Sequence, residues 1–277
     1  DARRYLSRAG YTQTNDGVTV SREYLHGRAD TVRFIADLLA ATAARPPRFN
    51  CFGLHEWAMV YRSPTPRHQS VPLRLGADGT DAVVESMPLR CTHFDAYRFF
   101  TEPAVRRNAS HLTRSGQVDA EQPGCVHAGM DLYKWAFKLG PLVESELVLA
   151  CLNLAVDARV LDMRASPYDL RGYGFAPIAV ETSGGRREYA RGQLELTERA
   201  GPLRAALLDR RTDRGWEVVD LLDAGHTHEQ AARHLGISQS AVTQRARAAG
   251  VVEGERAREL VAHLAGTALA RATEDVR

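Results

Sequence analysis

The sequence predicts an α+β domain followed by a small all-helical helix-turn-helix domain. Residues 1–208 combine segments whose apolar residues repeat at helical spacing with short segments rich in β-branched residues. Residues 209–277 contain two closely spaced helix-capping patterns and no strand-like segment. We therefore divide the chain into domains at 1–208 and 209–277. No apolar run reaches the roughly 18 residues that a membrane-spanning helix needs.

Four helices are expected in the first domain. Val32, Ile35 and Leu38 repeat at helical spacing, and Pro46-Pro47 ends their segment. An interruption is expected near Gly201-Pro202 in the last helix. The four expected helices are 29–45, 125–139, 144–161 and 186–208.

Short strands account for the β part of the prediction. The segment Gly76-Ala77-Asp78-Gly79 has the composition of a turn between two strands. The polar segment 101–124 is expected to be a long loop, and a second loop is expected at 162–174. The first part of the second loop, Asp162 to Asp169, is dense in polar groups and is a further candidate for chemistry. The expected strands are 72–75, 82–86, 89–94 and 175–181.

A helix-turn-helix pattern lies within 216–249. Thr227 and Gln230 form a capping box at the start of the second helix. Gly236 breaks that helix, and Ser238 caps the third. The run A-A-x-x-L-G-I-S-Q-S-A-V indicates a DNA-binding element rather than a generic three-helix packing module.

Double-stranded DNA is the expected partner of this element. Residues 209–277 carry 10 arginines and 11 acidic residues, so phosphate neutralisation is weak and we expect a homodimer or help from the rest of the chain. The third helix would read base edges, while arginines would hold phosphates. The expected base-reading residues are Gln239, Ser240, Thr243 and Gln244, and the phosphate-binding residues are Arg233, Arg245 and Arg247.

A polar stripe is the first candidate for chemistry in the larger domain. His127, Asp131, Lys134 and Lys138 share one face of a helix that is otherwise apolar. The two lysines are the only ones in the sequence, and a lysine can shift its pKa or form a Schiff base where arginine cannot. The alternative interpretation is a solvated face on which Asp131 pairs with the lysines.

Two further clusters contain titratable residues. His55 and Glu56 lie within an apolar run, and His93 and Asp95 alternate with apolar residues. The alternative interpretation for each is an ordinary core or surface polar group with its partners. His55, His93, His127, Asp95 and Asp131 include the residue types that ligate metals, but their separations match no known ligand pattern, so neither a metal nor another cofactor is expected.

Several classes of site are excluded by missing motifs. The chain has no Walker A motif, no dinucleotide-binding glycine pattern and no Gly-x-Ser-x-Gly elbow. Its four cysteines form no Cys-x-x-Cys pair, which favours reduced thiols and a cytoplasmic protein. The start of the sequence does not resemble a signal peptide, and we expect that it begins within a longer protein.

Five segments together resemble a known family. They are C-F-G-L-H-E-W-A-M-V-Y, L-R-L-G-A-D-G-T-D-A-V-V-E-S, H-F-D-A-Y-R-F-F, E-Q-P-G-C-V-H-A-G-M-D-L-Y-K-W-A-F-K-L and D-M-R-A-S-P-Y-D-L. Residues 25–207 resemble the actinobacterial proteins labelled 3-methyladenine DNA glycosylase. Residues 209–265 resemble the helix-turn-helix of SatD-type regulators and, more loosely, region-four modules of sigma factors.

The resemblance implies a base-excision enzyme that acts on DNA. Such an enzyme needs an aromatic pocket for a flipped nucleotide and a carboxylate that stabilises the oxocarbenium-like state. The expected catalytic residues are Asp131, Lys134, His127 and Glu56, and the expected pocket residues are His55, Trp57, His93, Asp95, Tyr133 and Lys138. Two alternatives stay open: a transcriptional regulator with a ligand-sensing domain, and an enzyme acting on a small nucleotide-like metabolite.

Overall fold

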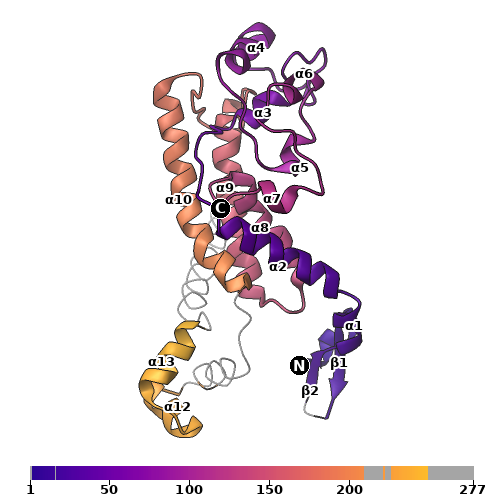
Figure 1. Cartoon of the computed structure of the whole chain (residues 1–277), viewed down its shortest axis with the longest axis vertical. Coiled ribbons are helices and arrows are strands. Elements are labelled where there is room, and N and C mark those ends of the chain that lie inside the picture. Colours follow the sequence, from indigo (N-terminus) through magenta and orange to yellow (C-terminus); the bar gives the residue numbers. More distant parts are fainter. Residues whose placement is uncertain (1, 16, 209–220, 222–225, 249–277) are drawn as a thin grey trace, which may run out of the picture.

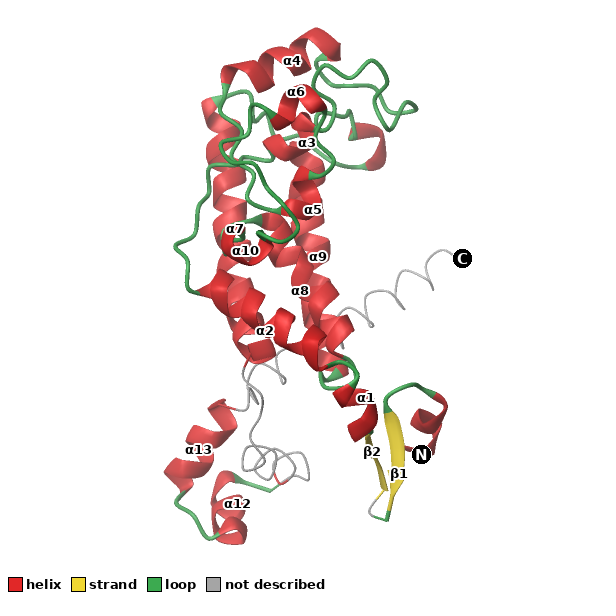
Figure 2. Cartoon of the chain, turned by 45° about the vertical axis from the view of Figure 1, so that its right-hand side comes forward, coloured by secondary structure: helices red, strands yellow, loops and turns green. Residues whose placement is uncertain are grey.

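The structure is a computed structural model that describes all residues except 1, 16, 209–220, 222–225 and 249–277 (Figure 1). Most of the described chain is helical. The four longest helices are α2 (Ala29–Ala43), α8 (Val126–Leu139), α9 (Ser145–Ala165) and α10 (Ser183–Leu208). α9 packs against both α8 and α10, and α2 packs against α10, so these helices form the body of the molecule (Figure 2).

Short helices complete the body. α4 and α6 lie at one end of the long helices, and the N-terminal hairpin lies at the other (Figure 1). The short elements are the 3₁₀ helices η1 (Ala2–Ser7) and η2 (Arg171–Tyr173), with α1 (Arg22–His26), α3 (Leu54–Ala58), α4 (Gly76–Ser86), α5 (Phe94–Tyr97), α6 (Glu102–Val105) and α7 (Gln117–Ala120).

The expected α+β class is wrong. In the described part of the chain, the sheet consists of one antiparallel pair, β1 (Tyr11–Thr14) and β2 (Gly17–Val20). This hairpin was not predicted, although Asn15-Asp16-Gly17 is a typical hairpin turn sequence. The strands expected further along the chain are not present.

The segment read as a turn and a strand is the helix α4. Gly76, with φ of 65°, opens the helix, and the Thr80 hydroxyl donates to the Gly76 carbonyl oxygen one turn earlier. Val83 and Val84 are both buried on this helix. Tertiary packing therefore overrides the β propensity of the two valines.

The other expected strands are extended segments that pair at single points. Leu73 forms an isolated bridge with Tyr168, and Leu89 forms one with Asn108. Segment 175–181 has no ladder, but its Ile178 is fully buried and its backbone N–H donates to the Arg164 carbonyl oxygen. These segments cross the helices instead of forming a sheet.

Two predicted helices and one predicted loop differ from expectation. α9 continues to Ala165, so Asp162 lies on a helix and not at the start of a loop. α10 runs through Pro202 without the expected interruption. The expected long loop 101–124 contains α6 and α7.

A continuous apolar core joins α2, α3, α8, α9 and α10. Trp57 is fully buried in it and donates its indole N–H to the Ala165 carbonyl oxygen at 2.8 Å. Gly53, at φ of 73°, precedes α3, and a Cβ atom there would come within 2.8 Å of the Ala165 side chain. Glycine thus allows α3 to lie directly against α9.

A second, small core belongs to α12 (His228–Leu235) and α13 (Gln239–Ala248). The predicted capping box of Thr227 and Gln230 is confirmed, and Gly236 has the predicted left-handed backbone. The Ser238 hydroxyl accepts from the Ala241 N–H, as predicted for a cap. Most of the first helix expected in this element, 216–224, lies outside the described residues.

Candidate functional site

Seven of the singled-out side chains, with three others, gather in two adjoining clusters on α8. The Asp162 cluster consists of His55 and Glu56 from α3, His127 from α8, and Arg159 and Asp162 from α9. The Asp131 cluster consists of His93, Asp95, Glu121, Asp131 and Lys134. The His127 ring lies between them, with its centroid 4.5 Å from that of His55 and 5.2 Å from that of His93.

Asp162 is the centre of the first cluster and is fully buried. Its Oδ1 lies 2.8 Å from Nε2 of His55, and its Oδ2 lies 4.0 Å from Nε2 of His127. The contact between His55 and Asp162 is close, but its angles are not those of a hydrogen bond, and neither atom has another partner for a hydrogen bond among the described residues. Arg159 donates to Oδ2 of Asp162 and to Oε1 of Glu56, each at 3.1 Å.

Burial and mutual contact shift the pKa values of this cluster strongly. Burial opposes ionisation of Asp162, but His55, His127 and Arg159 bring its pKa below the ordinary range. Burial also opposes protonation of His55, but the Asp162 carboxylate raises the pKa of that imidazole. Burial and the neighbouring His55 lower the pKa of His127 to about 3. Burial and Asp162 raise the pKa of Glu56 to about 7.

The Asp131 cluster is a more complete network of partners. Nε2 of His93 lies 3.2 Å from Oδ2 of Asp131 and 3.4 Å from Oε1 of Glu121. Lys134 bonds to Asp131 and, at 3.1 Å, to Asp95. The Gln117 amide donates to Glu121 at 2.6 Å, and Arg114 donates to Asp95 at 2.8 Å.

These partners also set the charge of the carboxylates. Burial opposes ionisation of Asp131, but His93 and Lys134 lower its pKa. Lys134 and Arg114 likewise lower the pKa of Asp95 against the effect of burial. Burial raises the pKa of Glu121. Two anionic carboxylates in this cluster therefore already face the ammonium of Lys134.

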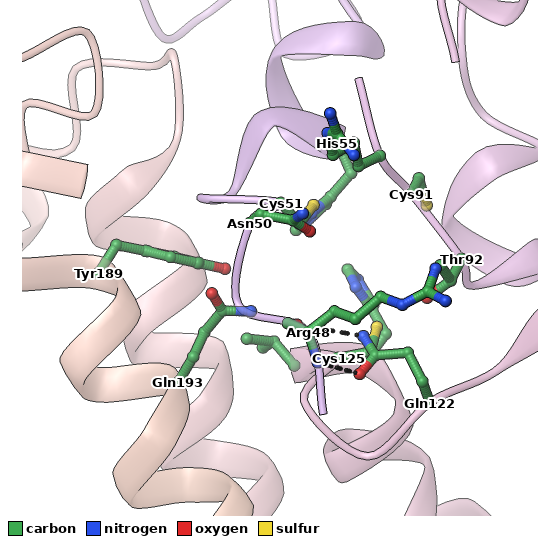
Figure 3. A pocket seen from close by; sticks show the side chains of 13 residues that line it. Arg48, Asn50, Cys51, His55, Cys91, Thr92, Gln122, Cys125, Tyr189 and Gln193 are labelled. Atoms are coloured by element: carbon green, nitrogen blue, oxygen red, sulfur yellow. Dashed lines mark hydrogen bonds between the residues drawn. The ribbon is translucent and has the colours of Figure 1, made fainter. Parts of the chain in front are cut away.

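A small cavity of about 10 Å³ adjoins the Asp162 cluster. His55, His127 and Cys51 line it, together with Tyr189 and Gln193 from α10 (Figure 3). The Tyr189 hydroxyl and the Gln193 amide oxygen are buried without a partner among the described residues. A cavity of this size, with polar groups in its wall, suits a single water molecule or ion.

A larger cavity of about 410 Å³ shares part of its wall with the small one. Arg48, Thr92 and Gln122 line both cavities. The Gln122 side chain is held by the Arg48 backbone, from which it accepts at 2.8 Å and to which it donates at 3.3 Å (Figure 3). The larger cavity has the size of a small-molecule site.

The structure brings most of the predicted chemistry residues together. Three predicted pocket residues lie outside the two clusters. Trp57 is in the core, and Tyr133 is half-buried beside Phe137. The exposed Lys138 lies over the Trp135 ring. None of the three lines either cavity. The predicted aromatic residues therefore do not form a base-binding pocket at these two cavities.

Sequence reasoning missed Glu121 and Arg159, and read Asp162 only as part of a polar loop. The buried stripe of α9 at Cys151, Leu154 and Ala158 continues to Ala165, which places Asp162 inside the helix. An arginine three residues before a buried aspartate is the signal that would have found this pair.

The predicted DNA-reading residues lie on α13. Gln239, Ser240, Thr243 and Gln244 are all exposed. The Thr243 hydroxyl contacts Nδ1 of His228 at 3.1 Å and donates to the Gln239 carbonyl oxygen. Arg233 is exposed and lies 3.8 Å from Glu229. The side chains of Arg245 and Arg247 lie outside the described part of the structure.

Neither family models, nor curated proteins, nor solved structures gave a match to this chain. Within the described residues, no helix combines the length and apolar character needed to cross a bilayer.

Proposed function

We propose that residues 2–208 form a hydrolase whose active centre is the Asp162 cluster, and that the substrate is an alkylated purine nucleotide in DNA. The small cavity beside the cluster carries the hydrolase assignment. Around it, the Tyr189 hydroxyl and the Gln193 amide oxygen are buried without partners among the described residues, and Nε2 of His55 has no aligned hydrogen bond. Such groups hold a water molecule well, and the carboxylate of Asp162 lies 2.8 Å from the His55 nitrogen.

Hydrolysis of an N-glycosidic bond uses these groups directly. The water oxygen forms a bond to C1′ of the deoxyribose while the bond from C1′ to the purine nitrogen breaks. The electron pair leaves with the base, which departs neutral because alkylation had made it cationic. One proton of the water passes to an imidazole or carboxylate of the cluster, and anionic Asp162 stabilises the oxocarbenium-like state.

The larger cavity supports a nucleotide unit as the substrate. Its wall contains Arg45 and Arg48 against a single carboxylate, Asp119. An excess of guanidinium groups favours phosphate, which they bind in a bidentate manner. Because Arg48, Thr92 and Gln122 line both cavities, a nucleotide held in the larger one would lie next to the small cavity that His55 and His127 line.

DNA as the carrier of that nucleotide is supported by α12 and α13 and by the family resemblance of residues 25–207 and 209–265. The exposed Gln239 and Gln244 present amides that pair with adenine edges. A homodimer would raise the affinity of this weakly charged element, and the reduced cysteines suit the cytoplasm. In a gel-shift assay, Gln239→Ala should weaken sequence-specific binding by about tenfold, and unchanged binding would remove this residue from the interface.

Release of free methylpurine from methylated duplex DNA tests the proposed activity. We expect release by the full chain, and a rate at least about 100-fold lower in Asp162→Asn. Asp157→Asn is the matched control, because Asp157 lies on the same helix but is half-exposed and pairs with Arg199. No release by the wild type, or equal release by Asp162→Asn, would refute the proposal.

A second candidate is a hydrolase acting on a free nucleotide-like metabolite. The enclosed position of the Asp162 cluster behind Arg48 and Gln122 favours it, since a small molecule reaches such a site without base flipping. Assaying purine nucleosides and nucleotides beside methylated DNA separates the two candidates. Turnover of free nucleotides alone would favour this second function.

A further inference from the structure

We propose that the Asp162 cluster binds one divalent transition-metal ion through ring nitrogens of His55 and His127 and carboxylate oxygens of Asp162 and Glu56. The inference rests on the proposed function for what the ion does, but not for whether it binds. Three separate helices, α3, α8 and α9, supply these side chains. Ligands from several packed helices surround an ion better than ligands from one helix face.

The distances fit one ion. One ligand atom of each of the four residues lies within 4.8 Å of the others. With metal–ligand bonds of about 2.0–2.2 Å, two ligands of the same ion lie at most about 4.3 Å apart. Small side-chain rotations therefore bring all four atoms into one coordination sphere.

The pair of His55 and Asp162 behaves like two neighbouring ligands. Nε2 and Oδ1 form a 2.8 Å ion pair without the alignment of a hydrogen bond, and neither atom has another partner for a hydrogen bond among the described residues. Buried polar atoms almost always have a partner, and an ion shared by both atoms would supply it. The other ring nitrogen of His55 contacts Sγ of Cys51 at 3.4 Å, which orients the ring as outer partners of metal ligands do.

The charges around the cluster are compatible with a bound cation. Arg159, which pairs with Asp162 and Glu56, has a side chain that is 51% exposed, so it can withdraw into solvent. A divalent ion would then bind the two carboxylates and Nε2 of His55, in place of a proton on that nitrogen. Two imidazoles with carboxylates suit Zn²⁺, Fe²⁺ or Mn²⁺ better than Mg²⁺ or Ca²⁺, which prefer oxygen ligands alone.

The Asp131 cluster offers a contrasting case within the same molecule. His93, Glu121 and Asp131 are as close together as the first set. However, the Lys134 ammonium already occupies Asp131, and the Gln117 amide occupies Glu121. A metal ion there would have to displace an internal cation, so the inference assigns the ion to the Asp162 cluster.

Titration of the full chain with Co²⁺ tests the inference independently of activity. The protein is first treated with a chelator and desalted, and binding is followed by visible d–d absorption and by equilibrium dialysis. We expect about one Co²⁺ per chain, displaced by Zn²⁺. His127→Gln should bind about 100-fold more weakly or worse, and Glu56→Gln, at a half-buried position, should also bind more weakly.

His93→Gln in the neighbouring cluster is the matched control and should keep the wild-type affinity. Circular dichroism of each variant shows whether it is folded. No stoichiometric binding by the wild type, or wild-type affinity in both His127→Gln and Glu56→Gln, overturns the inference. If the chain binds Co²⁺ but releases no methylpurine, the metal site is supported and the proposed reaction is refuted. If metal-free protein releases methylpurine at the full rate and binds no Co²⁺, the reaction is supported and the metal site is refuted.

Discussion

The Asp162 and Asp131 clusters are built from the same kinds of residue and meet at the His127 ring, yet they are completed differently. The Asp131 cluster contains its own cation, Lys134, which bonds to two of its carboxylates. The Asp162 cluster has its cation, Arg159, at the exposed edge, and its buried Nε2 of His55 and Oδ1 of Asp162 have no aligned hydrogen bond among the described residues. In the Asp131 cluster, Nδ1 of His93 is the one such atom. The position of the cation, and not its presence, thus separates a structural network from a site that is available for chemistry.

Removal of the central carboxylate should distinguish the clusters most strongly. Asp162→Ala leaves the buried His55 without its ion-pair partner and Arg159 with Glu56 alone, and we expect the free energy of unfolding to fall by about 3–5 kcal/mol. Asp131→Ala leaves Lys134 paired with Asp95, and we expect a loss of about 1–2 kcal/mol. Urea denaturation measures both values. Equal losses would mean that the two clusters have the same structural role.

Removal of the internal cation should make the clusters alike. Without its ammonium, Lys134→Met presents the carboxylates of Asp131 and Glu121 beside His93 as an open ligand set. We expect bound Co²⁺ to rise from about one to about two per chain. The control is Lys138→Met, at an exposed position four residues further along the chain, which should still bind about one Co²⁺. An unchanged stoichiometry in Lys134→Met would show that the ammonium is not what closes the Asp131 cluster.

The sequence predicted the residues of both clusters better than the fold that joins them. The helical spacing in 125–139 and 144–161 predicted α8 and α9 within a few residues, because long amphipathic periodicity is a strong signal. His127, Asp131 and Lys134 were therefore placed on one face correctly. Short segments failed, because the Val83–Val84 pair and the bridges of Leu73 and Leu89 depend on tertiary partners that no local pattern encodes.

The pairing of distant residues was beyond local patterns as well. Asp162 lies 107 positions from its partner His55, and their contact depends on α3 lying against α9 at Gly53. A polar residue at the end of an apolar stripe looks like the start of a loop until that packing is known. For the same reason, the sequence did not predict that His55 and Asp162 could share a metal ion.

The orienting contact of Cys51 gives a smaller effect. Cys51→Ala removes the sulfur next to Nδ1 of His55, and we expect the affinity for Co²⁺ to fall by about tenfold. Cys91→Ala is a suitable comparison, since the Cys91 thiol contacts the His93 carbonyl oxygen in the other cluster. Cys91→Ala should leave the affinity unchanged. Equal Co²⁺ affinity in the two variants would contradict an orienting role for Cys51.

Arg159 should have the smallest effect, and in the opposite direction. Its guanidinium repels a bound cation and competes for two carboxylates, so Arg159→Gln should strengthen Co²⁺ binding by about fivefold, or roughly 1 kcal/mol. Because the side chain is half-exposed, the free energy of unfolding should change by less than about 1 kcal/mol. Weaker Co²⁺ binding in this variant would indicate that Arg159 supports the ion's ligands instead of competing with the ion.

Anomalous X-ray scattering from crystals of the full chain grown with Zn²⁺ tests the central claim most directly. The account predicts a single strong peak between His55, His127 and Asp162 within the part of the chain described here, with Lys134 still bonded to Asp131. A peak between His93, Glu121 and Asp131, or no peak in either cluster, would contradict it.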